Sequence, residues 1–198
     1  RITGDGRYAQ HALGLIDEWA INPATRFVPH ITSNNREIEI YITQPGIIFG
    51  ADLIWSYGGW TQAQRQSFVG WVGDLADAYI DDATSNNIDL WRLNLLAVAG
   101  RFTGRAELTA YALGRYTSRV GSLISPDGVM LTEIDRTRSL FYSVFGASAL
   151  VNLAEILRLD GHNLYAVEGG AGQTLLTALD NLATYLVEPD PIASWPYE

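Results

Sequence analysis

The chain has 198 residues, of which 47% are hydrophobic and 18% are charged, and its formal net charge is −9. This composition is that of a globular domain with a real core, and it excludes a disordered chain. The negative charge argues against binding to nucleic acid, which needs clustered Lys and Arg, and the absence of cysteine excludes a disulfide scaffold and a thiolate zinc site.

Helical spacing of apolar residues dominates the chain from its beginning to its end. It predicts helices over residues 7–20, about 62–82, 88–102, 107–124, 139–159 and 174–186. A capping-box pattern, Thr61 with Gln64, marks the start of the second of these. Turn residues such as Gly58-Gly59 and Asp160-Gly161 separate the helices. The pattern predicts an all-α protein built from antiparallel helical hairpins.

One segment between the first two helices is ambiguous. Residues 38–43 alternate with β-branched side chains, which is a weak strand signal, and Pro45 ends it. The alternative is a helix that starts at Pro45, where a missing N–H costs nothing. No uninterrupted apolar run reaches the roughly 18 residues that a membrane span needs, so we expect no membrane partner.

The most informative segment runs from Glu133 to Tyr142. It follows a tight turn at residues 125–128 and places Arg136 and Arg138 just before a helix, with Tyr142 about one turn inside it. Either arginine has a spacing that lets it share a face with Tyr142. A guanidinium beside a phenol favours the phenolate, which makes the phenol a usable proton shuttle. The alternative is a solvated ion-pair cluster that caps the helix, with Tyr142 in the core.

Two further sets of side chains are candidates for binding. Asn86 and Asn87 stand directly before a predicted helix, where they are either an ordinary N-cap or amides that hydrogen-bond a substrate carboxylate. Trp60 follows two glycines, so we expect it to be exposed and able to stack on a sugar ring, and Trp91 is a second candidate. Helical spacing with Leu and Val favours a place in the core for Trp19 and Trp71, and the same place is the alternative for Trp91.

These motifs occur together in one order, and in that order they resemble the alginate lyase domain of the α/α-toroid polysaccharide lyases. The resemblance is carried by Asn86-Asn87, Ser125-Pro126-Asp127-Gly128, Glu133 with Arg136 to Tyr142, Leu153 to Ile156, and Gly161 to Tyr165. It implies that residues 1–198 form a single incomplete α/α toroid. The number of predicted helices is too small to close such a ring, so we expect a domain that lacks N-terminal helices of a larger toroid.

The resemblance also implies a function, which is β-elimination in a polymer of 4-linked uronic acid such as alginate, mannuronan or glucuronan. Carried over, Asn87 and Arg136 neutralise the substrate carboxylate and Tyr142 transfers the proton. Substrate-binding roles fall to Asn86, Arg138, Glu133, Trp60 and Trp91. We expect no cofactor and no metal, because the three histidines have no ligand spacing. By resemblance the protein is secreted or periplasmic.

One position departs from the family pattern. The asparagine pair is commonly followed by histidine, whereas this chain has Ile88, which can neither donate nor accept a proton. The alternative function is therefore a non-catalytic carbohydrate-binding or scaffold relative. A glycoside hydrolase would need two carboxylates that flank the bond, and the candidates Glu133 and Asp135 lie on one short segment.

Overall fold

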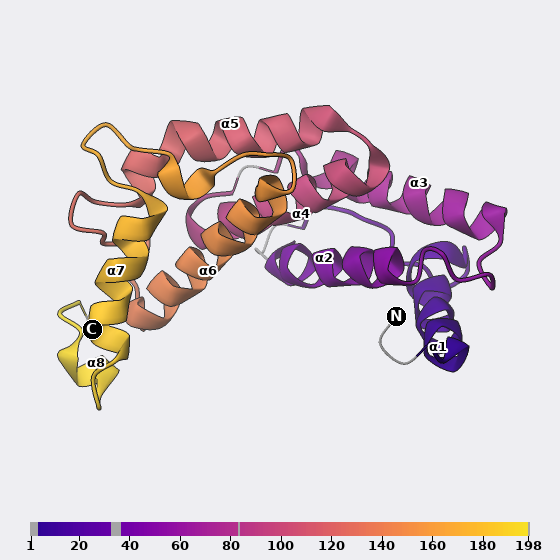
Figure 1. Cartoon of the computed structure of the whole chain (residues 1–198), viewed down its shortest axis with the longest axis horizontal. Helices are drawn as coiled ribbons and strands as arrows, with labels where there is room; N and C mark the ends of the chain where they lie inside the picture. The colour runs from indigo at the N-terminus through magenta and orange to yellow at the C-terminus, as the bar shows by residue number, and fades with distance from the viewer. Residues whose placement is uncertain (1–3, 33–36, 83, 198) are drawn as a thin grey trace.

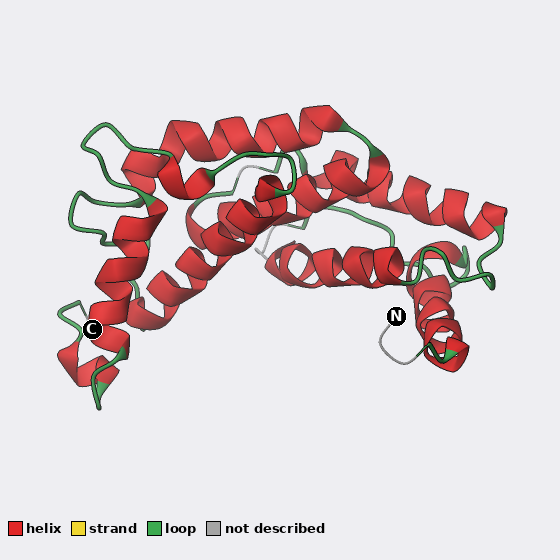
Figure 2. Cartoon of the chain, viewed as in Figure 1, coloured by secondary structure: helices red, strands yellow, loops and turns green. Residues whose placement is uncertain are grey.

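A computed structural model describes residues 4–32, 37–82 and 84–197 of the chain. Its long helices are α1 (Gly6–Ile16), α2 (Glu37–Leu53), α3 (Gln62–Tyr79), α4 (Asn86–Thr103), α5 (Ala106–Leu123), α6 (Ser139–Arg158) and α7 (Leu175–Leu186). Shorter elements are the π-helical turn η1 (Asp17–Ile21), the 3-10 turn η2 (Leu164–Ala166) and the short helix α8 (Pro191–Ser194). Within these described ranges no strand forms, and Figure 2 shows helices joined by loops.

Helix α4 is the centre of the architecture, because α2, α3, α5 and α6 all pack against it. The chain forms an arch, with α1 at one end and α7 and α8 at the other (Figure 1). Successive helices run back and forth as hairpins, as the short connections predict. This arrangement confirms the all-α hairpin fold.

The sequence of α4 suits this central place. Every residue from Arg92 to Gly100 is buried, so the helix meets protein on all sides. Gly104 ends it in the left-handed region at φ 75°, a conformation in which a Cβ atom is unfavourable. Helix α6 is long enough to cross a membrane, and its most apolar stretch of 18 residues has a mean hydropathy of 1.6. In the fold, 56% of that stretch is buried. Packing against α4 and α7 accounts for its apolar composition.

Neither alternative for the ambiguous segment is correct, since residues 38–43 form the first part of α2 and not a strand. The helix also passes through Pro45 instead of starting there. Its buried side chains include Tyr41, Pro45, Ile48 and Ala51, a spacing of three to four residues that places them on one helical face. Contact of this face with α4 overrides the local β-branched alternation.

The predicted start of α3 is confirmed. The hydroxyl of Thr61 accepts a hydrogen bond from the backbone N–H of Gln64 at 3.1 Å, and the Gln64 side chain accepts one from the Thr61 N–H at 3.0 Å. The inward face is also as expected, because its five apolar residues are all buried: Phe68, Val72, Leu75, Ala76 and Tyr79.

Two predictions for tryptophans are wrong. Trp60 is only 3% exposed, because its ring packs against Trp55 and Phe68 at centroid distances of 5.3 and 5.9 Å. Trp60 is therefore a core residue and is not available to a sugar. Trp19, which we expected in the core, is 43% exposed, whereas Trp71 is buried as expected.

A buried carboxylate joins α4 to α5. Asp89 is fully buried and forms ion pairs with Arg92 at 2.7 Å, with Arg115 at 3.3 Å and with Arg119. Arg92, itself 1% exposed, also donates to the backbone carbonyl of Tyr79 at 3.1 Å. This cluster fixes the first turn of α4 against α5 and against the end of α3.

We expect Asp89→Ala to lower the free energy of unfolding by about 3–5 kcal/mol, because it leaves the buried Arg92 guanidinium without its carboxylate. Urea denaturation followed by circular dichroism measures this change. The matched control is Asp77→Ala, which removes a 64% exposed partner of Arg105 and should cost less than about 1 kcal/mol. Equal losses in the two variants would contradict the prediction.

A buried phenol makes the stability of the fold depend on pH. Burial raises the pKa of Tyr116 from 10.0 to about 12, and its hydroxyl donates to the carbonyl of Leu164 in η2 at 3.2 Å. Because folding favours the neutral phenol, this contribution is complete below pH 10 and is lost as the pH rises from 10 to 12. We expect the free energy of unfolding of Tyr116→Phe to fall less than that of the parent across this window. Parallel curves for the two proteins would contradict this.

Candidate functional site

The predicted site residues meet where the first turn of α4 faces the segment before α6. The backbone N–H and the side-chain Nδ2 of Asn87 donate to the two carboxylate oxygens of Glu133, each at 2.9 Å. Glu133 thus caps the N-terminus of α4, where unpaired N–H groups and the helix dipole favour an anion. It is α4 that this carboxylate caps, rather than the helix that follows Glu133 in the sequence.

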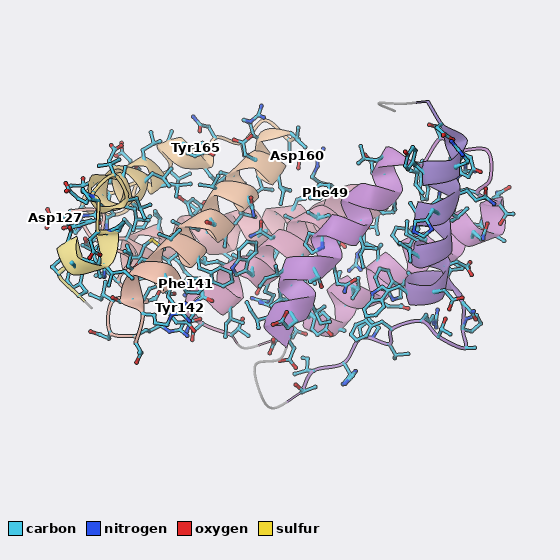
Figure 3. All side chains as sticks on the ribbon, turned by 90° about the horizontal axis from the view of Figure 1, so that it is seen from below. Phe49, Asp127, Phe141, Tyr142, Asp160 and Tyr165 are labelled. Carbon is cyan, nitrogen blue, oxygen red and sulfur yellow. The ribbon has the colours of Figure 1, made fainter. Side chains whose placement is uncertain are left out.

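Arg136 connects this cap to Tyr142. Its Nη1 donates to Oε2 of Glu133 at 3.1 Å, and its Cζ lies 3.6 Å from the centroid of the Tyr142 ring. Arg138 lies over the neighbouring ring instead, with its Cζ 4.7 Å from the centroid of Phe141. Of the two arginines that spacing allowed, Arg136 is therefore the one beside the phenol. Figure 3 shows Phe141 and Tyr142 together at one end of α6 and Asp160 at the opposite end.

Asn86 and Ile88 flank Asn87 at the start of α4. Asn86 has a left-handed backbone with φ 51°, and its side-chain oxygen accepts from the N–H of Ile88 at 3.1 Å. Asn86 and Asn87 therefore lie in the first turn of α4 and not before it, and the Asn86 side chain satisfies one free N–H group of that turn. The Ile88 side chain is half-buried and packs against the core.

Glu133 was expected to contact the substrate, but the structure places it where a substrate cannot reach it. It is fully buried, and its carboxylate accepts from Asn87, from Arg136 and from the Thr132 hydroxyl at 3.0 Å. Asp135, two residues later, is exposed. One carboxylate sealed inside the protein and one open to solvent cannot flank a glycosidic bond, so the geometry gives no support to a glycoside hydrolase.

Trp91 is half-buried and lines a groove between α2, α4 and α6 with a volume of about 360 Å³. Its ring lies 5.1 Å from that of Phe145, which in turn stacks on Phe141 at 6.0 Å. A row of aromatic rings therefore runs from the Tyr142 end of α6 to this groove. The groove also carries polar side chains, among them Asn94 and Asn152.

Two contributors to the site were missed from the sequence. Thr132 donates to Glu133, and Gly146 in α6 packs behind the site, where an added Cβ would be 3.2 Å from Met130 Cε and 3.7 Å from Asn87 Cβ and Glu133 Cγ. A lone glycine inside an apolar helix indicates a close approach of another element, and this signal was available. Nothing local to Thr132 indicates its hydrogen bond.

The chemistry of the site follows from what remains accessible. The Arg136 side chain is 33% exposed and Tyr142 is half-buried, so a guanidinium and a phenol reach solvent side by side. Asn87 is only 2% exposed, and one of its amide hydrogens is engaged by Glu133. The arrangement offers hydrogen-bond donors and a positive charge next to a group that can exchange a proton.

Comparison with known proteins places these features in a family. The sequence matches the alginate lyase family model over residues 1–192. Among solved structures, an alginate lyase from Bacteroides ovatus has a TM-score of 0.88 at 23% identity, and the match covers 99% of this chain and 56% of that one. Alginate lyase A1-III from Sphingomonas species A1 has a TM-score of 0.82 at 24% identity, with coverage of 98% and 56%.

A variant of alginate lyase A1-III complexed with a tetrasaccharide is also similar, with a TM-score of 0.83 at 24% identity over 99% of this chain and 59% of that chain. The present chain thus spans somewhat more than half the length of these solved relatives. No match was found among curated proteins. The resemblance expected from the ordered motifs is confirmed by the family match. The chain belongs to the alginate lyase family, and its helical hairpins have the fold of an incomplete α/α toroid.

Proposed function

We propose that the chain carries the proton-transfer site of a polysaccharide lyase that cleaves a polymer of 4-linked uronic acid, such as alginate, mannuronan or glucuronan, by β-elimination. The observation that supports this most directly is the guanidinium of Arg136 at 3.6 Å from the ring of Tyr142, in a position linked through Glu133 to Asn87. The family match supports a lyase in general terms.

The proposed reaction assigns one role to each residue. Arg136 and Asn87 donate hydrogen bonds to the substrate carboxylate, which makes the proton on C5 more acidic. Tyr142 removes that proton, and the electron pair forms the C4–C5 double bond as the bond from C4 to O4 breaks. Tyr142 then returns the proton to the departing O4. Donors that are held in place where negative charge develops lower the barrier to such a step.

The substrate class fits the local charge better than the overall charge. The net charge of −9 repels a polyanion at long range, but salt screens this repulsion beyond ~8–10 Å. At closer range the polymer meets Arg136, with Arg138 a few residues away. Trp91 and the neighbouring rings are proposed to stack on sugar units, and a polymer substrate is consistent with a secreted or periplasmic protein.

Tyr142→Phe tests the proposal, because it keeps the ring under Arg136 and removes only the hydroxyl. We expect kcat on the preferred uronate polymer to fall by roughly 10²- to 10⁴-fold, as for the loss of a general acid–base group. The absorbance of the unsaturated product measures this. The control is Tyr8→Phe, which removes a hydroxyl from a 69% exposed side chain on α1, at the other end of the arch, and should leave kcat unchanged. Full activity of Tyr142→Phe would exclude Tyr142 as the base.

Ile88 favours a second candidate, a carbohydrate-binding relative without catalysis. The side chain following Asn87 is apolar and packs on the core, so it supplies no imidazole to the site. Isothermal titration with uronate oligosaccharides, combined with the product assay, separates the two functions. Binding without any unsaturated product supports this candidate, and product formation that depends on Tyr142 excludes it.

A further inference from the structure

We infer that Glu133 is a positioning residue that holds Asn87 and Arg136 in one fixed geometry and makes the resting site electrically neutral. This inference rests on the proposed function for its catalytic consequence, and on the hydrogen bonds of Glu133 for its structural part. It replaces the substrate-binding role that the sequence indicated for Glu133.

The first step is the number of donors that one carboxylate satisfies. Oε1 accepts from the Asn87 backbone at 2.9 Å and from Thr132 at 3.0 Å, while Oε2 accepts from Asn87 Nδ2 at 2.9 Å and from Arg136 at 3.1 Å. Because Glu133 is fully buried, these bonds form away from competing water. The carboxylate therefore fixes the main chain and the side chain of Asn87 at once.

The second step concerns the orientation of the two donors. A buried carboxylate next to Asn87 requires the amide to point its N–H group, rather than its carbonyl, at Glu133. Arg136 is held from two sides, by Glu133 through Nη1 and by the ring of Tyr142. Gly146 closes the back of the site, since a Cβ there would lie 3.2 Å from Met130 Cε and in van der Waals contact with Asn87 and Glu133. The donors are thus ordered before a substrate arrives, which lowers the entropy cost of the reaction.

The third step concerns charge. The negative charge of Glu133 balances the positive charge of Arg136, so the pair has no net charge. Arg136 can still bind a substrate carboxylate through its remaining N–H groups. It binds that carboxylate more weakly than an arginine without an anionic partner would. Removal of the Glu133 charge should therefore strengthen binding of an anionic substrate while it loosens the geometry. This split between binding and turnover distinguishes positioning from simple structural support.

The kinetic test is Glu133→Gln in the full chain. We expect kcat to fall on the order of 100-fold, as for a misplaced reacting group, while KM decreases because the uncompensated guanidinium of Arg136 binds the anionic substrate more strongly. The control is Glu107→Gln, which removes an exposed carboxylate paired with Arg105 and should change neither kcat nor KM.

Glu133→Asp is the conservative partner variant. It keeps the negative charge but shortens the side chain by one methylene, so it cannot reach all of the donors. We expect it to keep the parent's KM and to have a kcat between those of the parent and Glu133→Gln. A kcat of Glu133→Gln within threefold of the parent, or equal losses of kcat in the two variants with unchanged KM, would overturn the positioning role.

A measurement on the unmodified protein keeps the inference testable if the variants fail to fold. Hydrogen exchange of the Asn87 side-chain amide, followed by NMR, should be slow because that amide is buried against Glu133. Rapid exchange of this amide would overturn the inference. If the parent is inactive on every uronate polymer, the proposed function fails, whereas slow exchange at Asn87 would still support the Glu133 clamp.

Discussion

The structure depends on the burial of one helix, α4, in which every residue from Arg92 to Gly100 is buried. In its first turn Asn87 and Asp89 are buried as well, so their polar groups need partners from the protein. The fold supplies these partners: Glu133 caps the N-terminus, and the charges of Arg92, Arg115 and Arg119 meet Asp89 inside the fold. The stability of the core and the order of the candidate site have this common origin.

The same requirement explains why the candidate site lies at this end of α4. The carboxylate that caps α4 comes from a segment far away in sequence, the one before α6. That segment then brings Arg136 and Tyr142 to the same place. A buried acid that satisfies several donors is stable there, whereas a buried acid without partners would be costly. Structural capping and the proposed chemistry therefore use one carboxylate.

Most helices could be predicted because their apolar spacing and caps are local. The capping box at Thr61 and the buried face of α3 follow from residues that are neighbours in sequence. The errors occur where tertiary contacts decide the secondary structure or the burial of a side chain. Residues 38–43 are helical because their apolar face packs on α4, and Trp60 is buried because Trp55 and Phe68 enclose it, although the glycines before it indicate an exposed loop.

The sequence by itself determined the helical class, the order of the motifs and the family that they resemble, because these depend on spacing along the chain. It also determined that Ile88 cannot supply a proton. Only the tertiary structure decided that Arg136 rather than Arg138 lies over Tyr142, and that Glu133 is buried against Asn87. Glu133 and Asn87 are 46 positions apart, and no local rule of helix or turn formation reaches across that separation.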